Sequence, residues 1–383
     1  MTEYGHGAGT VASRTVLLED LTPEDISRWS RLSNDPLEPS PFVTPEFLMS
    51  AHRLFGGTDD VRMVVVEQDD RWIAALPLSP MGRLRSTPVR YASTAGPLLG
   101  RRASLCAPLV DRERANDAVG GLLEHLAARR ARLPGLIELT LLPADGALAR
   151  LITDQCRARS IPVQERSRFS RAYALAAPEP TAPDHMSSSR RKQLRRRERG
   201  LERVVGAPLE FIDHGNSLAA FDRLLDLEVS GWKGERGSAV RKKPREEAWC
   251  TDVFRGFSEL DRARVFELRA GEVTLYMSQV LVSGRTAFGL IDAYDEQYST
   301  FSPGSIGRVL EQQRLLALDA IDAFDPCMHP DRYPEATTLY PSRRDIISLL
   351  LAPRWPDRLL LHIRPALRRL RQTRGTRPAA SDA

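Results

Sequence analysis

The chain has 383 residues, of which 42% are hydrophobic and 27% charged, and 55 Lys and Arg against 50 Asp and Glu give a net charge of +5. This length is about twice that of a usual single domain, so we expect two domains or one large α/β unit. The balanced composition excludes collagen-like, mucin-like and wholly disordered chains.

The cysteines and the N-terminus limit the class of protein further. The four cysteines, Cys106, Cys156, Cys250 and Cys327, form neither a C-x-x-C pair nor a cluster with histidine. We therefore expect no structural zinc site, no other metal and no disulfide framework. The first residues lack the basic and apolar segments of a signal peptide, and no apolar run reaches the roughly 18 residues that span a bilayer. These features predict a reduced, cytoplasmic protein.

The first half of the chain predicts helices around a sheet. Residues 1–40 are polar and contain several prolines, which indicates a loosely ordered entry. Thr44, Pro45 and Glu46 suit an N-cap, a first helical turn and the positive end of the helix dipole. The elements predicted after residue 40 are a helix over 44–55, strands over 61–67 and 72–78, a helix over 116–131, a strand over 136–142 and a helix over 147–160.

A segment rich in Pro and Ala divides the chain at 176–186. It predicts an N-terminal domain over 1–175, a second domain over 187–350 and a basic C-terminal helix and tail over 351–383. The elements predicted in the second domain are a strand over 209–213, helices over 217–230 and 246–259, strands over 265–270, 273–282 and 286–293, a helix over 302–318 and a strand over 320–325. Each half therefore has helices around a mainly antiparallel mixed sheet, an α/β (α+β) arrangement.

Two segments hold the positive charge. Residues 185–203 contain eight basic and two acidic side chains, and residues 354–377 contain eight Arg and one Asp, so the rest of the chain is acidic. The first segment is interpreted as a solvated helix face or as a contact for anions or a membrane surface. It lacks interleaved aromatic residues, which disfavours specific nucleic-acid binding. The second segment mixes Trp and Leu with Arg, so it is either a helix at an anionic membrane or one packed on its domain.

The start of the helix predicted over 302–318 has the composition of an anion site. Its residues are Ser302, Pro303, Gly304, Ser305, Ile306, Gly307 and Arg308. Small residues leave backbone N–H groups accessible at the positive end of a helix, and an arginine adds a formal charge for a phosphate. The segment is neither a Walker A loop nor a dinucleotide fingerprint. The alternative is an ordinary capped helix with Ser302 as N-cap and Pro303 as first residue.

Three segments together resemble a known family. They are Ser-Ser-Arg-Arg-Lys-Gln-Leu-Arg-Arg-Arg at 188–197, the segment 228–239 around Trp232-Lys233-Gly234, and the segment 292–304. In order and spacing, residues 187–344 resemble the GNAT-type acetyltransferase domain of cellulose-biosynthesis-associated acyltransferases. The resemblance implies that the strand, loop and helix around 292–308 bind acyl-CoA, with the pyrophosphate on the N–H groups of 302–308, and that the acyl group passes to an amine, for example on an envelope sugar or lipid precursor.

The first domain looks like a partner of the same kind. The Fem peptidoglycan aminoacyltransferases of the wider superfamily pair two GNAT-like domains, and this likeness implies two GNAT-like domains here. Two alternatives stay open: a Fem-like aminoacyltransferase that uses aminoacyl-tRNA, and a non-catalytic GNAT-like binding protein in a polysaccharide or membrane assembly. The second is suggested by Tyr333, near which the Lys of the family's segment is missing.

Acyl transfer from a thioester to an amine needs a base for the amine and an acid for the leaving thiolate. Asp292, Asp331 and His329 are the candidate bases, and Tyr294 and Tyr333 are the candidate acids. The alternatives are that Asp292 caps a turn, that the tyrosines pack at the edge of the core and that His329 is plain surface.

The acceptor side is assigned to the segment after the helix predicted over 217–230. Trp232 and Lys233 are expected to form a wall for the acceptor, with the ammonium of Lys233 attracting an anionic group, and His329 is expected on the same side. The alternative is a helix that ends at small residues with Trp232 packed on the core.

Overall fold

The computed structural model describes residues 10–56, 60–83, 89–176, 186–334, 338–355, 357, 358 and 361. The elements of the first half are β1 (Ala12–Leu17), α1 (Pro23–Leu32), α2 (Pro45–Phe55), β2 (Arg62–Gln68), β3 (Arg71–Arg83), β4 (Arg90–Ser93), β5 (Leu109–Val110), α3 (Ala115–Ala127), β6 (Leu136–Pro143), α4 (Ala147–Ala158) and β7 (Val163–Leu175). Those of the second half are α5 (Ser188–Val205), β8 (Leu209–Asp213), α6 (Leu218–Ser230), α7 (Trp232–Glu235), α8 (Pro244–Glu259), β9 (Ala263–Ala270), β10 (Val273–Ser283), β11 (Thr286–Tyr294), α9 (Pro303–Leu316), β12 (Ala323–Asp325) and β13 (Ser342–Leu351). Short 3-10 helices are η1 (Leu18–Asp20), η2 (Pro41–Val43), η3 (Arg129–Ala131), η4 (Val240–Lys242) and η5 (Glu296–Phe301).

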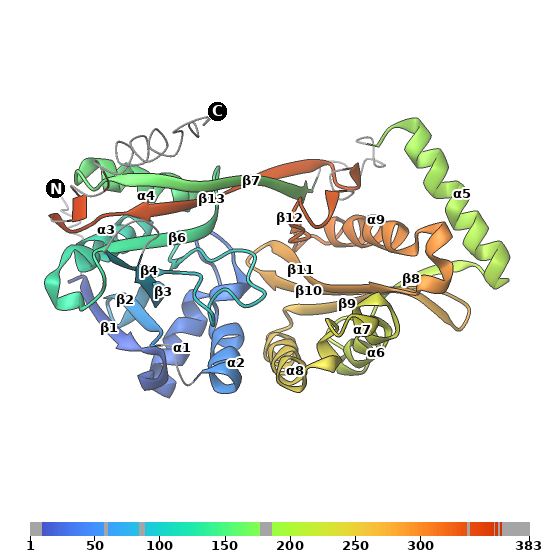
Figure 1. Cartoon of the computed structure of the whole chain (residues 1–383), viewed down its shortest axis with the longest axis horizontal. Helices are drawn as coiled ribbons and strands as arrows, with labels where there is room; N and C mark the ends of the chain where they lie inside the picture. Colours follow the sequence, from blue (N-terminus) through green and yellow to red (C-terminus); the bar gives the residue numbers. More distant parts are fainter. Residues whose placement is uncertain are drawn as a thin grey trace, which may run out of the picture.

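The strands form one 13-stranded sheet in the order β1-β2-β3-β4-β6-β13-β7-β12-β11-β10-β9-β8, with β5 beside β3. Helices flank the sheet in two lobes, and α5 extends away from the second lobe (Figure 1). Most neighbouring strands are antiparallel, and the parallel pairs are β4 with β6 and β11 with β12. The expected α/β fold with helices around a mainly antiparallel mixed sheet is thereby confirmed.

Strand β7 joins the two lobes. Most of its length pairs with β13, whereas its last residues, Ala174 and Leu175, pair with β12 of the second lobe. Strand β13 comes after the second lobe in the chain but lies between β6 and β7 in the first. The domain boundaries given from the sequence stay a prediction. The strand pairing adds that residues 342–351 belong to the sheet of the first lobe.

The expectation of a loosely ordered entry over residues 1–40 is wrong for residues 12–32. Strand β1 pairs with β2 over its whole length, and α1 has a capping box between Thr22 and Asp25. Trp29 of α1 is fully buried, and its Nε1–H donates to the carbonyl of Val43 at 3.1 Å. One large buried side chain therefore anchors a segment whose composition is otherwise polar.

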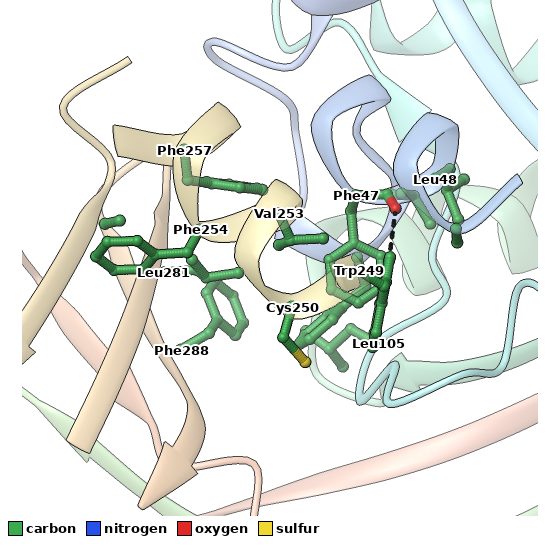
Figure 2. Close-up of a cluster of buried hydrophobic side chains, with 14 of the residues drawn as sticks. Phe47, Leu48, Leu105, Trp249, Cys250, Val253, Phe254, Phe257, Leu281 and Phe288 are labelled. Carbon is green, nitrogen blue, oxygen red and sulfur yellow. Dashed lines mark hydrogen bonds between the residues drawn. The ribbon is translucent and has the colours of Figure 1, made fainter. Parts of the chain in front are cut away.

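The two lobes share a hydrophobic core between α2 and α8. The indole of Trp249 packs edge-on against Phe47 with ring centroids 5.1 Å apart, and its Nε1–H donates to the Phe47 carbonyl at 3.4 Å. Figure 2 shows Trp249 of α8 between Phe47 of the first lobe and the aromatic side chains of the second, such as Phe254 and Phe288. Because this core is continuous, the lobes pack directly on each other.

Two segments that the sequence analysis singled out are described only in part. Most of the Pro/Ala segment at 176–186 and most of the basic segment at 351–383 lie outside the described residues. None of the helices in the described ranges is both long and apolar enough to cross a membrane.

Candidate active site

A cavity opens where β11 and β12 separate. The two strands pair in parallel only from Thr286–Phe288 to Ala323–Asp325. Pro326, which has no N–H for a strand ladder, follows, and the Asp325 side chain accepts the N–H of Cys327, which has a left-handed backbone at φ 58°. The chain of β12 therefore turns away from β11. The cavity beside this gap has a volume of about 960 Å³ and is lined by residues of both lobes, including Arg102, Ser104 and Phe169 of the first.

Helix α9 lies unusually close to strand β10 at one wall of this cavity. A Cβ atom at Gly307 would lie 2.1 Å from Cδ1 of the buried Tyr276, so only glycine permits this approach. One turn further along α9, Glu311 reaches β10. Its carboxylate accepts hydrogen bonds from the hydroxyls of Ser278 at 2.6 Å and Tyr276 at 3.1 Å.

Glu311 is a buried carboxylate that lines the cavity and is only 3% exposed. Burial raises the pKa of Glu311 to about 7, and the hydrogen bond from Ser278 is the largest opposing influence. A carboxyl group with a pKa near neutrality can accept a proton from an amine and release it again at physiological pH. Sequence reasoning missed Glu311; the available signal was its place on the same helix face as Gly307 and Leu315, at spacings of four.

Asp292, one of the candidate bases from the sequence, is paired with Arg308. Both Nε and Nη2 of Arg308 lie 2.8 Å from Oδ2 of Asp292. Burial alone would raise the pKa of Asp292, but the charges of Arg308 and Lys233 and the hydrogen bonding of Arg308 outweigh it and hold the pKa below its usual range. The ion pair makes Asp292 a weak base and engages the guanidinium expected for a phosphate.

Lys233 connects the acceptor segment to the sheet. Its ammonium donates to the Asp292 carbonyl at 2.8 Å and to Oε1 of Glu228 at 3.1 Å. The other oxygen of Glu228 accepts the N–H of Val240 at 2.8 Å. The Trp232-Lys233 segment is therefore fixed against β11, and Lys233 has its charge balanced by Glu228.

A second cavity, of about 320 Å³, lies over the N-terminus of α9. Of the seven residues expected at an anion site, Ser302, Gly304, Ser305 and Arg308 line it. The other three, Pro303, Ile306 and Gly307, are buried. Ser302 precedes the helix with a left-handed backbone at φ 52° and makes no side-chain cap. The N–H of Gly304, the second helical residue, has no acceptor within the helix and carries the positive end of its dipole.

The two cavities share part of their walls. Trp232, Lys233, Asp292 and Tyr333 line both. A ligand that binds its anionic part at the start of α9 thus lies next to the cavity that Glu311 lines.

Comparison with known families decides the class of this site. Residues 188–333 match the family described as acetyltransferase (GNAT) domain. This segment therefore resembles a GNAT acetyltransferase domain. The second half of the chain therefore carries an N-acyltransferase, as the sequence indicated, and the helix α9, both cavities and Glu311 belong to it or border it.

Solved structures extend the likeness of fold to most of the chain. A conserved protein of unknown function from Bacteroides thetaiotaomicron covers 88% of this chain and 99% of its own, with a TM-score of 0.51 and 10% identity. FemX covers 87% and 96%, with a TM-score of 0.52 and 10% identity. The C-terminal domain (DUF2156) of a putative lysylphosphatidylglycerol synthetase from Agrobacterium fabrum covers 89% and 95%, with a TM-score of 0.49 and 14% identity. The comparison with curated proteins gives no match.

The remaining candidate residues differ in which of the two cavities they line. Tyr294 lines the smaller cavity only, whereas Tyr333 lines both and lies under the guanidinium of Arg308, whose Cζ is 5.8 Å from the ring centroid. His329 lines the larger cavity and packs against Phe169 with ring centroids 4.6 Å apart. Asp331 is 90% exposed and lines neither cavity. Of these four candidates, Tyr333 is thus the one that lines both cavities.

In the described ranges of the chain, no three His, Cys, Asp or Glu side chains are placed together to hold an ion. The chemistry that the site offers is a carboxyl group that titrates near neutrality, a tyrosine between two cavities and a helix N-terminus.

Proposed function

We propose that the chain transfers an acyl group from acyl-CoA to a primary amine. The observation that carries this proposal is Glu311, a buried carboxyl group with a pKa of about 7 in the wall of a cavity that shares residues with the cavity at the start of α9. The donor occupies the smaller cavity and the amine the larger one. Holding both reactants side by side supplies roughly 7–11 kcal/mol of the barrier.

The donor side rests on the start of α9. The phosphates of acyl-CoA bind the N–H of Gly304 and the hydroxyls of Ser302 and Ser305, which line the smaller cavity. Arg308 contributes through its ion pair with Asp292 and not as a free charge. The thioester then lies beside Trp232 and Tyr333, where the two cavities meet.

The proton transfers balance around the new amide. The amine nitrogen attacks the thioester carbonyl, the C–N bond forms and the C–S bond breaks. Glu311 takes the proton that the nitrogen loses, directly or through a water molecule. The hydroxyl of Tyr333 protonates the leaving thiolate, a role for which Tyr294 is less well placed because it lines only the donor cavity.

The acceptor in this proposal is an amine on an envelope sugar or lipid precursor. We also propose that the enzyme is an acyltransferase of the cellulose-biosynthesis-associated type. In this proposal the protein lies in the cytoplasm, with peripheral contact to the inner face of the membrane through its basic segments. The exposed cations of α5, which extends from the second lobe (Figure 1), are available for such a contact.

Calorimetry with acetyl-CoA tests the donor site. We expect wild type and Ser305→Gln to bind it and Ser305→Glu, which differs from Gln only in charge, to lose at least tenfold in affinity. Ser305 is the better position for this test than Gly304, because a Cβ at Gly304 already lies 3.1 Å from the Tyr294 ring. Absence of binding by wild type, or equal binding by both variants, would overturn the acyl-CoA site.

A second candidate donor is an aminoacyl-tRNA, as in a Fem-like enzyme. It is favoured by one exposed stripe on α5 with cations at spacings of three and four: Lys192, Arg195, Arg196, Arg199 and Arg203. Aminoacyl transfer from charged tRNA to an amine, together with no affinity for acetyl-CoA, would support this donor. Binding of acetyl-CoA without turnover on any amine would favour a non-catalytic binding protein.

A further inference from the structure

A cluster of charges on the acceptor side of the larger cavity is not used by the proposed reaction. Glu246 of α8 lies 3.2 Å from Nη1 of Arg101, 3.0 Å from Nη2 of Arg102 and 3.9 Å from Nζ of Lys243. One carboxylate thus pairs with three cationic side chains, so the cluster has an excess of positive charge. The N-terminus of α8, whose first residue is Pro244, adds a partial positive charge at the same place.

Only part of this cluster faces the cavity. Arg102, Lys243 and Glu246 line it, whereas Arg101 does not and instead lies over the ring of Phe55, 3.8 Å from its centroid. Arg102 has a left-handed backbone at φ 50°, a conformation that is uncommon for a residue other than glycine. Strained positions of this kind concentrate at ligand sites. This one directs a side chain of the first lobe into a cavity formed mainly by the second.

The rest of the cavity does not neutralise the excess. Five cationic side chains line it besides Arg171, whose charge is balanced by the buried Asp325: Arg102, Lys233, Arg236, Lys243 and Arg332, against the carboxylates of Glu228, Glu246, Asp292 and Glu311. Glu228 is already bound to Lys233, and Asp292 is bound to Arg308. Glu311, on α9, accepts hydrogen bonds from the hydroxyls of Tyr276 and Ser278. Of these four carboxylates, the one paired with Arg102 is Glu246, and Glu246 is shared with Arg101 and Lys243.

We propose that the acceptor carries, besides its amine, an anionic group that binds Arg102 and Lys243. Carboxylates and phosphates are the groups that an arginine fork and a lysine bind best, so the shared chemistry is an oxyanion. This inference rests on the proposed acyl transfer and names its acceptor class, an amine with a carboxylate or phosphate. It also gives the first lobe a function, since Arg102 supplies acceptor recognition from outside the GNAT domain.

Matched pairs of acceptors test the inference. Release of CoA from acetyl-CoA is measured with glucosamine 6-phosphate against glucosamine, and with amino acids against their amides. We expect kcat/KM to be at least tenfold higher for the anionic member of one pair, and the pair that shows it distinguishes phosphate from carboxylate. Arg102→Ala should remove that preference, so that the two members of the pair react with similar kcat/KM.

Arg101→Ala is the matched control. It also removes one arginine from Glu246, but that arginine does not line the cavity. We expect this variant to keep the preference for the anionic acceptor. Equal rates for the two members of both pairs in wild type, or equal effects of the two substitutions, would overturn the inference.

The failure of this inference can be told apart from that of the proposed function. Acetyl-CoA binding that is lost in Ser305→Glu, with no preference for anionic amines, leaves the proposed function and removes the acceptor class. If no amine in the panel is acylated, calorimetry with inorganic phosphate and with acetate replaces the rates. Binding that Arg102→Ala abolishes and Arg101→Ala retains supports the inference, and absence of binding contradicts it.

Discussion

Ser278 of β10 donates a 2.6 Å hydrogen bond to Oε1 of Glu311 on α9, and both residues are at most 3% exposed. This bond and the one from Tyr276 hold an ionisable carboxyl group at the wall of the larger cavity. The protonation state of Glu311 therefore affects both the proposed reaction and the stability of the fold.

The rate of acyl transfer should follow the ionisation of Glu311. Since only the carboxylate accepts a proton, kcat/KM should rise as pH increases through about 7 in the wild type. Glu311→Gln should lower kcat/KM by about 100-fold or more and abolish this rise, the ascending limb of the pH profile. The measurement is CoA release between about pH 5.5 and 9 with an amine that titrates well above this range.

Ser278→Ala provides a second readout of the same group. Its hydrogen bond lowers the pKa of Glu311, so its removal should move the limb to higher pH without abolishing it. A limb near pH 7 that persists in Glu311→Gln would show that another group is the base.

The same carboxyl group should make stability depend on pH. Its pKa is 4.5 in the unfolded reference and about 7 in the fold, so between these values the folded state binds more protons than the unfolded state. The free energy of unfolding should therefore fall as pH rises through this window, by about 3 kcal/mol from this one group. Urea denaturation at pH 5 and pH 8 should show Glu311→Gln gaining stability relative to wild type at pH 8. An equal change with pH in the two proteins would contradict the burial of an ionisable Glu311.

Much of the second lobe could be predicted because its signals are local. The strands β9, β10 and β11 are joined by turns at Gly271 and Gly284, both with positive φ, and the sequence placed both turns. The start of α9 at Pro303 was likewise evident from Ser302 and Pro303, because a proline fits the first turn of a helix.

The strands that join the lobes could not be predicted in this way. The apolar residues of β13 contact cores on both faces of the sheet, with Ile346 in one cluster and Ile347 and Leu349 in another. A strand buried on both faces has no alternation of polar and apolar residues to reveal it. Its partners β6 and β7 are also distant in the sequence, and local patterns do not encode such pairing.

In the candidate site, too, the features with local sequence signals could be predicted and those that depend on tertiary packing could not. Sequence reasoning singled out the helix N-terminus and Tyr333 as candidates, since small residues and an aromatic residue in a loop are visible signals. It named Asp292, near the end of a predicted strand, among the candidate bases and did not consider Glu311, which lies within a helix. The ion pair of Asp292 with Arg308 and the burial of Glu311 arise only when α9 packs on β10 and β11.

The close approach of α9 to β10 should fail when a side chain is added at Gly307. Its Cβ would lie 2.1 Å from the ring of Tyr276, which is only 1% exposed and cannot move into solvent. We expect Gly307→Ala to lower the free energy of unfolding by about 1–3 kcal/mol and to reduce acyl transfer, because Glu311 lies one turn away. Urea denaturation and CoA release measure the two effects.

Gly120→Ala in α3 is the control for a glycine within a helix. Its nearest neighbour outside the helix backbone is Nη2 of Arg159 at 3.0 Å, the end of a flexible side chain. Alanine favours helices more than glycine, so this variant should gain up to about 1 kcal/mol and leave the transfer rate unchanged. A stabilised Gly307→Ala would show that α9 can move away from β10 at no cost.

The buried ion pair between Arg171 of β7 and Asp325 of β12 should hold the two lobes together at the floor of the larger cavity. Nη2 of Arg171 lies 2.6 Å from Oδ2 of Asp325, and their side chains are 3% and 0% exposed. Arg171→Met leaves a carboxylate buried without its partner, which should lower the free energy of unfolding by about 3–5 kcal/mol. Adding Asp325→Leu should recover part of this loss, since no unpaired charge then remains.

Arg168, on the same strand, pairs with Asp345 at 2.9 Å with both side chains 47% exposed. Arg168→Met should leave the urea midpoint nearly unchanged because solvent screens that pair. Equal losses in Arg171→Met and Arg168→Met would show that the pair at the junction of the lobes is no more important than one on the surface.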